Sequence, residues 1–163
     1  MTDYDLKLQQ LQKEFIEINT KRANKWQFTP DQKAIYDFVI KSQRYTTFNI
    51  AGYDIILKVG NEDFGFKHFL LKHYGTGCVG EIKANDILKL GNVIKHNISV
   101  PAKEDKIKFI QTKGDLKYSV VLKPQKDGKL VVSFFSSKEE IKIIEQIEII
   151  NEIIISVEIE TKL

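Results

Sequence analysis

Two alternating segments on either side of Asp127-Gly128 constrain the fold of this chain more than any other feature. Residues 116–123 and 129–135 place apolar side chains at every second position, and Asp-Gly is a strong signal for a tight turn between antiparallel strands. One face of the resulting hairpin carries Tyr118, Val120, Leu122, Leu130, Val132 and Phe134. The opposite face carries Lys117, Ser119, Lys123 and Ser133. The pattern therefore predicts an antiparallel sheet with one apolar and one polar face.

Helical patterns precede this hairpin. Residues 3–24 have apolar side chains at helical spacing, which indicates an amphipathic arm that packs either on the domain or on a partner. A second helix begins at a capping box formed by Thr29 and Gln32, with Pro30 at its first position, and should run to about residue 43. Further elements are expected as strands at 45–50, 53–59 and 106–112, a helix at 62–74, and a short helix at 87–90 that Gly91 ends or kinks.

These elements together predict an α+β fold in which N-terminal helices pack on a twisted antiparallel sheet. The expected organisation is a helical arm, residues 1–27, followed by a single domain, residues 28–163. A chain of 163 residues that is 42% hydrophobic can bury a substantial core. In the tail, Ser137 is expected to cap a helix that ends near residue 147, and alternating isoleucines predict a strand from about 152 to 160.

The composition excludes several classes of protein. The single cysteine, Cys78, excludes an internal disulfide, and no clustered Cys/His pattern indicates zinc, so neither a metal nor a cofactor is expected. No apolar run approaches membrane length, and the first twenty residues are charged throughout instead of forming an apolar signal-peptide core. We therefore expect a cytoplasmic protein with no membrane partner.

The charge is concentrated in the middle of the chain. Residues 58–138 contain 15 Lys or Arg against 8 Asp or Glu, whereas residues 139–163 contain 2 against 7. A basic block followed by an acidic tail is typical of a polyanion-binding domain whose end partly covers the basic surface, although lysines scattered on solvated faces give the same count.

His68 and His73 are the candidate catalytic side chains, because imidazole titrates nearest to neutral pH and Lys67 and Lys72 lie beside them. A five-residue offset separates the two rings by about 140° on a straight helix. His73 then falls in the apolar stripe with Tyr74, where a merely structural histidine is the alternative. Both rings can face one phosphate of a polyanion only if the last helical turn unwinds at Tyr74-Gly75 or if the polyanion wraps around the helix end.

The glycine-rich loop after this helix has two interpretations. Backbone N–H groups near Gly75, Thr76, Gly77 and Gly80 can approach an anion, although the loop lacks the pattern of a nucleotide-binding P-loop. The ordinary alternative is a helix C-cap followed by a turn.

Residues 64–138 contain, in this order, Gly-Phe-Lys-His68-Phe-Leu-Leu-Lys-His73-Tyr-Gly, Gly80-Glu-Ile-Lys-Ala-Asn-Asp86-Ile-Leu, Tyr118-Ser-Val-Val and Lys129-Leu-Val-Val-Ser133-Phe-Phe-Ser136. This order of segments resembles the phage-associated branch of the barnase, EndoU, colicin and RelE-like ribonuclease superfamily. It implies an α+β ribonuclease that cleaves RNA without a metal, acts as a toxin or as an effector of a phage or mobile element, and has a cognate inhibitor or immunity protein as a possible partner. The matched region contains no arginine, and no unique catalytic lysine can be aligned.

Metal-free RNA cleavage uses the ribose 2'-hydroxyl as the nucleophile, so it needs a base, an acid and cations for the phosphorane. We expect His68 to be the base and His73 to be the acid, because a helix C-terminus stabilises an imidazolium. Phosphate is expected to bind to Lys117 or Lys123 and to be oriented by Ser133 or Ser136, while Lys67, Lys72 and Thr76 contact RNA.

The competing hypothesis is a non-catalytic module that binds RNA or protein. In this case Tyr118, Phe134 or Phe135 would stack on bases from a basic sheet face, or the amphipathic arm would bind a partner. His96 is expected at the surface, and Trp26 is expected to pack at the junction between the arm and the domain.

Overall fold

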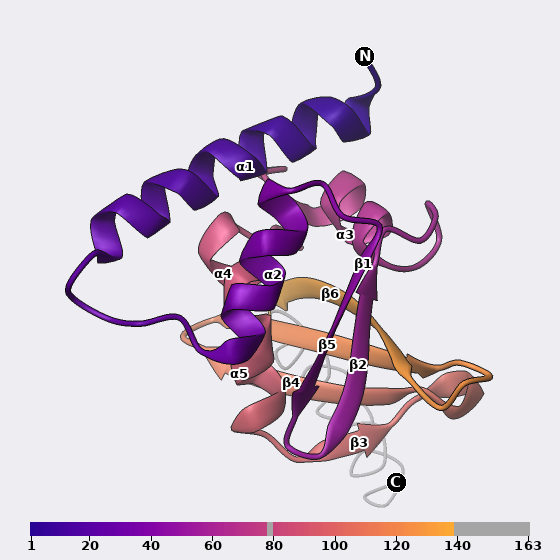
Figure 1. Cartoon of the computed structure of the whole chain (residues 1–163). Helices are drawn as coiled ribbons and strands as arrows, with labels where there is room; N and C mark the ends of the chain where they lie inside the picture. The colour runs from indigo at the N-terminus through magenta and orange to yellow at the C-terminus, as the bar shows by residue number, and fades with distance from the viewer. Residues whose placement is uncertain (78–79, 139–163) are drawn as a thin grey trace, which may run out of the picture.

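The computed structural model describes residues 1–77 and 80–138 (Figure 1). In chain order the elements are α1 (Asp3–Arg22), α2 (Pro30–Ile40), β1 (Tyr45–Ile50), β2 (Tyr53–Lys58), α3 (Phe66–His73), α4 (Ala84–Leu88), α5 (Leu90–Lys95), β3 (Ser99–Pro101), the short 3-10 helix η1 (Lys103–Asp105), β4 (Ile107–Lys113), β5 (Leu116–Pro124) and β6 (Leu130–Lys138). The N-terminal helices pack against a six-stranded sheet. The α+β class predicted from the sequence is therefore confirmed.

The sheet has the strand order β1-β2-β6-β5-β4-β3. Neighbouring strands pair antiparallel except for β2 and β6, which run parallel, so the sheet is mixed and not purely antiparallel as expected. A tight hairpin imposes antiparallel pairing, and no such turn joins β2 to β6. The local turn signals in the sequence therefore carried no information about this pair.

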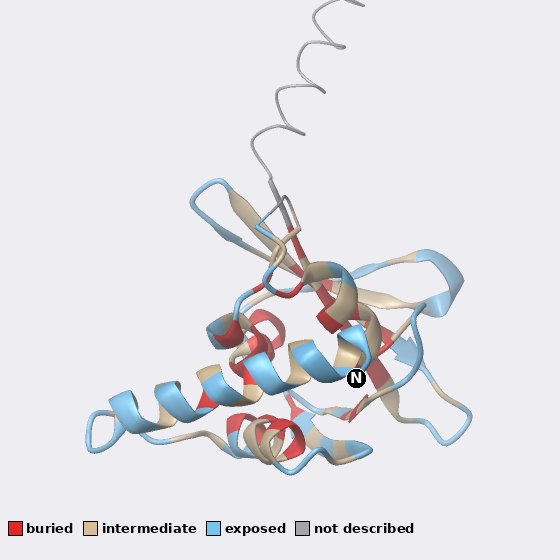
Figure 2. Ribbon diagram, turned by 90° about the horizontal axis from the view of Figure 1, so that it is seen from above, coloured by how far each residue is buried: buried red, intermediate tan, exposed pale blue. Residues whose placement is uncertain are grey.

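Residue pairing assigns the side chains of β4, β5 and β6 to two faces. Val120 lies opposite Phe134 and Leu122 lies opposite Val132, which confirms the apolar face predicted for the hairpin. We call this side the inner face, and helices α2, α4 and α5 lie on it (Figures 1 and 2). The opposite side, the outer face, carries Lys108, Ile110, Lys117, Ser119, Val121, Lys123, Ser133 and Phe135.

A series of aromatic contacts holds α3 between α2 and the sheet. The ring centroids of Phe38 and Phe66 are 5.0 Å apart, those of Phe66 and Phe69 are 5.2 Å apart, and those of Phe69 and Phe134 are 6.4 Å apart. All four side chains are buried. Truncating a buried phenylalanine to alanine typically costs about 3 to 5 kcal/mol, so these contacts strongly favour one position of α3 and its histidines.

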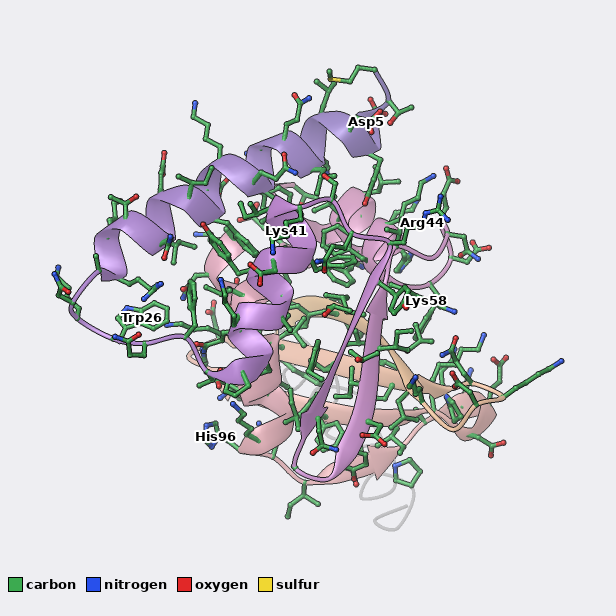
Figure 3. The ribbon with its side chains drawn as sticks, viewed as in Figure 1. Asp5, Trp26, Lys41, Arg44, Lys58 and His96 are labelled. Atoms are coloured by element: carbon green, nitrogen blue, oxygen red, sulfur yellow. The ribbon has the colours of Figure 1, made fainter. Side chains whose placement is uncertain are left out.

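The amphipathic arm, α1, packs on the domain. Leu11 and Phe15 are fully buried on its inner side, which is the first of the two predicted alternatives. After α1 the chain turns at Trp26, whose ring centroid lies 5.5 Å from that of Phe28 and 4.8 Å from Lys89 Nζ (Figure 3). Trp26 therefore packs at the junction of arm and domain, as predicted.

The capping signals at the second helix are also confirmed. Thr29 accepts a hydrogen bond from the Gln32 backbone N–H, and the Gln32 side chain accepts one from the Thr29 backbone N–H. The histidine helix, in contrast, begins at Phe66 and not at residue 62. The Asn61 side-chain carbonyl accepts hydrogen bonds from two backbone N–H groups just after it, which holds the segment before α3 as a turn.

The role predicted for Gly91 is wrong. The helix break falls at Lys89, and Gly91 lies inside α5. A Cβ atom at Gly91 would be 2.3 Å from Asp31 Oδ2 and 2.7 Å from Ile50 Cδ1, so close packing of α5 on α2 and β1 accounts for the glycine.

His96 is exposed at the end of α5, as predicted (Figure 3). Strand β6 continues through Lys138, so the backbone of Ser137 belongs to a strand and does not begin the expected helix. The remaining predictions for the tail, including the strand at 152–160, lie outside the described residues. No helix in residues 1–77 and 80–138 combines the length and apolar character needed to cross a membrane.

Candidate functional site

The ring of His68, in the first turn of α3, lies beside the ring of His73, the last residue of that helix. Their centroids are 5.7 Å apart with an interplanar angle of 75°. The last turn of α3 is wider than an α-helical turn, because the Tyr74 N–H donates to the carbonyl of Phe69, five residues earlier, at 3.2 Å. A wider turn rotates less per residue, and Tyr74 then leaves the helix in an extended conformation. This local departure from the straight helix brings together two side chains that regular spacing would separate.

The two imidazoles have different surroundings. His68 Nδ1 lies 2.7 Å from the backbone carbonyl of Glu62, which fixes Nδ1 as the donor and directs Nε2 away from that contact. His73 is half-buried, and its ring centroid is 5.8 Å from that of Phe135. Gly80 lies against the His73 ring, and a Cβ atom at this glycine would be 3.4 Å from Nδ1.

The pKa of His73 is lowered, chiefly because burial disfavours the charged imidazolium. The neighbouring positive charges of His68, Lys7 and Lys72 lower it further, while a hydrogen bond with the Gly80 backbone opposes the shift. The sequence-based expectation that the helix C-terminus stabilises a protonated His73 is therefore wrong in direction. Lys7 Nζ already donates to three backbone carbonyls at that helix end, those of Leu70, Leu71 and Tyr74.

Phe135 and Lys108 extend this site onto the outer face of the sheet. Phe135 lies on β6 beside His73, and Lys108 Nζ from β4 lies 5.7 Å from the centroid of the Phe135 ring. Lys108 was missed in the sequence analysis, although the alternation of 106–112 places it on the face opposite Phe109. The other two aromatic residues of the alternative hypothesis, Tyr118 and Phe134, lie on the inner face, where Phe134 is buried and Tyr118 is half-buried.

The two candidate serines lie on opposite faces. Ser133 belongs to the outer face and is buried. Ser136 is also buried, but its hydroxyl donates to the Glu81 carbonyl and its backbone N–H donates to the Gly80 carbonyl at 3.4 Å. Ser136 therefore ties the glycine-rich loop to β6 and does not face the same side as Ser133. Ser133 and Ser136 are three positions apart on one strand, and successive side chains of a strand alternate between its faces, so the two serines must lie on opposite faces.

Lys117 and Lys123 both lie on the outer face but near opposite ends of β5. Lys123 is exposed, with Nζ 5.7 Å from the ring centroid of Phe64 in the loop before α3. Lys117 is half-buried and pairs across the sheet with Thr112. The two lysines are six positions apart along the strand, or about 20 Å, so they are suited to different phosphates of one RNA chain and not to the same one.

The remaining predicted RNA contacts are divided between two sides of α3. Lys67 lies towards α1, with Nζ 5.9 Å from the ring centroid of Tyr4, and not towards the sheet. Lys72 is exposed and near enough to His73 to affect its charge. Thr76 is half-buried in the glycine-rich loop.

The described part of the glycine-rich loop forms a turn. The Gly75 N–H donates to the Ile82 carbonyl at 3.2 Å, and the Gly77 N–H donates to the Glu81 carboxylate. These two donors are therefore already engaged, which favours the turn over the anion cradle. Cys78 lies outside the described residues.

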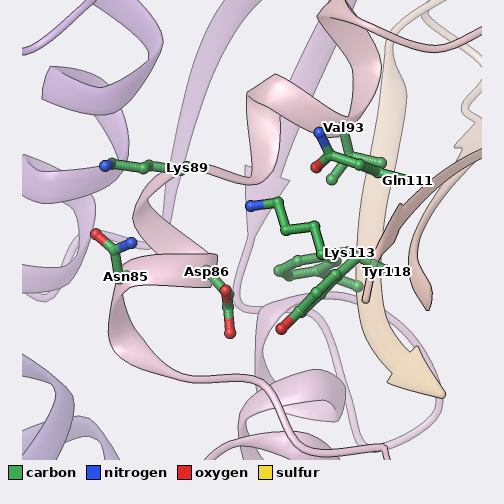
Figure 4. Close-up of a pocket in the computed structure, with 8 residues that line it drawn as sticks. Asn85, Asp86, Lys89, Val93, Gln111, Lys113 and Tyr118 are labelled. Carbon is green, nitrogen blue, oxygen red and sulfur yellow. The ribbon is translucent and has the colours of Figure 1, made fainter. Parts of the chain in front are cut away.

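A pocket between α4, α5 and the inner face is too small for a nucleotide (Figure 4). Its volume is about 20 Å³, which is room for one water molecule. Burial, and then the charges of Asp86 and Glu81, raise the pKa of Tyr118 at this pocket. Its lining residues are Asn85, Asp86, Lys89, Val93, Gln111, Lys113, Tyr118 and Phe134.

Among the described residues, no three His, Cys, Asp or Glu side chains come together as ligands for a metal ion. The chain matches no protein-family model, and neither a curated protein nor a solved structure is similar to it. A function for this chain therefore has to be inferred from the geometry of its own residues.

Proposed function

We propose that this protein is a metal-independent endoribonuclease that leaves a 2',3'-cyclic phosphate. The observation that carries the proposal is the pair of imidazole rings 5.7 Å apart at the edge of a sheet face that carries Lys108, Lys117 and Lys123. Two imidazoles at this separation can act on the two oxygens that flank one phosphorus, and cations nearby stabilise the phosphorane. The resemblance of residues 64–138 to the ribonuclease superfamily favours the same chemistry.

The protonation states favour His73 as the base, the reverse of the role expected from the sequence. A lowered pKa keeps His73 neutral near pH 7, so it can accept the proton of the 2'-hydroxyl. The 2'-oxygen then forms a bond to phosphorus, and the bond from phosphorus to the 5'-oxygen breaks. A protonated His68, with Nδ1–H bonded to the Glu62 carbonyl, donates its Nε2 proton to the leaving 5'-oxygen. The products are a cyclic phosphate end and a 5'-hydroxyl end.

The outer face supplies a path for the RNA backbone. Phe135 offers an aromatic ring on which a base can stack beside His73. Lys108 Nζ lies 5.7 Å from the centroid of this ring, and Lys117 and Lys123 lie on the same face of β5, on either side of Ser119, which pairs with Phe135. The proposal also includes a toxin or effector role in a target cytoplasm, with a cognate inhibitor as partner. The resemblance alone supports this role.

The test is incubation of a purified RNA oligonucleotide with the protein in EDTA, followed by end-group analysis. We expect a cyclic or 3'-phosphate and a 5'-hydroxyl, and no cleavage of the all-deoxy oligonucleotide, which lacks the internal nucleophile. His68→Ala and His73→Ala should each lower the rate by about 10² to 10⁴. His96→Ala removes an exposed imidazole at the end of α5 and serves as the matched control.

The second candidate is a module that binds RNA without cleaving it, and the position of Phe135 beneath Lys108 favours it. Tight, salt-dependent binding with intact RNA would support this module. Comparable cleavage of RNA and DNA, or full activity of a folded His73→Ala variant, would contradict the proposed mechanism.

A further inference from the structure

Lys7 of α1 makes a concentrated set of contacts with the end of the histidine helix. Its Nζ donates to the backbone carbonyls of Leu70, Leu71 and Tyr74 at 3.3, 3.0 and 2.9 Å. An ammonium group has three protons, so these bonds use its full donor capacity. They also satisfy carbonyls at the end of α3, where a helix leaves acceptors without intrahelical partners.

A second contact from α1 holds the same turn. The Tyr74 hydroxyl donates to Glu14 Oε1 at 2.6 Å, and Tyr74 is buried. Tyr74 is also the residue whose N–H closes the wide last turn on the Phe69 carbonyl. Two residues of α1 therefore hold Tyr74 through its carbonyl and its hydroxyl, directly after His73.

We propose that Lys7 is a positioning residue for the histidine pair, because its ammonium group fixes the wide turn that places the His73 ring beside His68. The role in catalysis rests on the proposed function, whereas the role in ring geometry does not. Lys7 lies on the helical arm, 61 residues before His68 in the sequence, and its Nζ donates to backbone carbonyls and not to an imidazole.

Electrostatics gives Lys7 a second effect on the same side chain. The carbonyl end of a helix stabilises a nearby cation, but here the Lys7 ammonium neutralises that end and adds a positive charge of its own. The other charged groups that face His73 are His68 and Lys72 from α3 and, across the Phe135 ring, Lys108 from β4. These groups are all cationic when protonated, and the charges of His68, Lys7 and Lys72 each favour a neutral His73.

The test compares Lys7→Met with Lys13→Met in the full chain. Both variants remove one ammonium group from α1, but Lys13 is exposed, so it is the matched control. NMR of the imidazole groups, without RNA, measures their titration midpoints and the through-space signal between the two rings. In Lys7→Met we expect a weaker signal between the rings and a His73 midpoint at higher pH, and in Lys13→Met we expect neither change.

A merely structural Lys7 would lower the melting temperature and leave the ring signal and the His73 midpoint of the folded protein unchanged, which would overturn the proposal. If Lys7→Met does not fold, Lys7→Arg is the second variant, because it retains a positive charge and hydrogen-bond donors. It should keep the wild-type ring signal and the wild-type His73 midpoint, and a loss of both would also overturn the proposal. In a cleavage assay, kcat of Lys7→Met should fall by about 10²-fold with an unchanged KM. If the wild-type protein does not cleave RNA, the proposed ribonuclease function is refuted. The NMR measurements would still test whether Lys7 positions the two rings.

Discussion

Replacing Lys108, Lys117 and Lys123 with glutamine should weaken RNA binding mainly at low salt. On single-stranded nucleic acid, each phosphate neutralised by a cation contributes about 0.7 to the slope of log Kobs against log salt. Lys117 and Lys123 lie about 20 Å apart along β5, and Lys108 lies on a different strand, so the three side chains contact separate phosphates. The loss of three contacts should therefore reduce the slope by about 2.

Fluorescence anisotropy of a labelled, 2'-O-methylated RNA, which lacks the nucleophilic hydroxyl, measures this slope without cleavage. The control variant replaces Lys13, Lys25 and Lys41 with glutamine, which makes the same change in net charge at exposed positions (Figure 3 shows Lys41 on the helical side). Circular dichroism verifies that both variants fold. An equal reduction of the slope in both variants would show that overall charge, and not the outer face, binds RNA. An unchanged slope in the outer-face variant would refute the proposed path.

Three further predictions concern single side chains. Because the pKa of His73 is lowered by folding, the stability that this neutral imidazole contributes is present above its unfolded value of about 6.5 and is lost as the pH falls through the folded value. His73→Gln should remove that part of the pH dependence of the melting temperature. If the melting temperatures of the wild-type protein and the variant fall equally as the pH is lowered, the lowered pKa of His73 is contradicted. Gly91→Ala gains about 1 kcal/mol of helix propensity but places Cβ 2.3 Å from the buried Asp31 carboxylate, so urea titration should show net destabilisation by up to about 2 kcal/mol, whereas stabilisation would contradict the close packing. Phe135→Leu should weaken RNA binding by about 1 to 3 kcal/mol in the same anisotropy assay, and unchanged affinity would exclude base stacking on this ring.

Much of the fold was predictable because its signals are local. The capping box at Thr29 needs only side chains within one turn, and the Asp127-Gly128 turn fixes the register of the two strands that flank it. That register decided which side chains share a face, so the sequence alone correctly placed Lys117, Lys123 and Ser133 together. The parallel pairing of β2 with β6 was not predictable in this way, since no turn joins the two strands.

The sequence by itself determined the two helices at the start of the chain, the hairpin, the faces of its strands and the presence of two imidazoles within one helix. Only the tertiary structure decided that these imidazoles meet, that Lys108 and Phe135 lie beside them, and that Ser136 does not. It also decided the direction in which the pKa of His73 shifts, because burial and the charges of His68 and Lys7 lower it, against the effect expected from the helix end alone. The physical reason is range: hydrogen bonds and side-chain periodicity act over a few residues of sequence, whereas desolvation and charge depend on groups that only folding brings within a few ångströms.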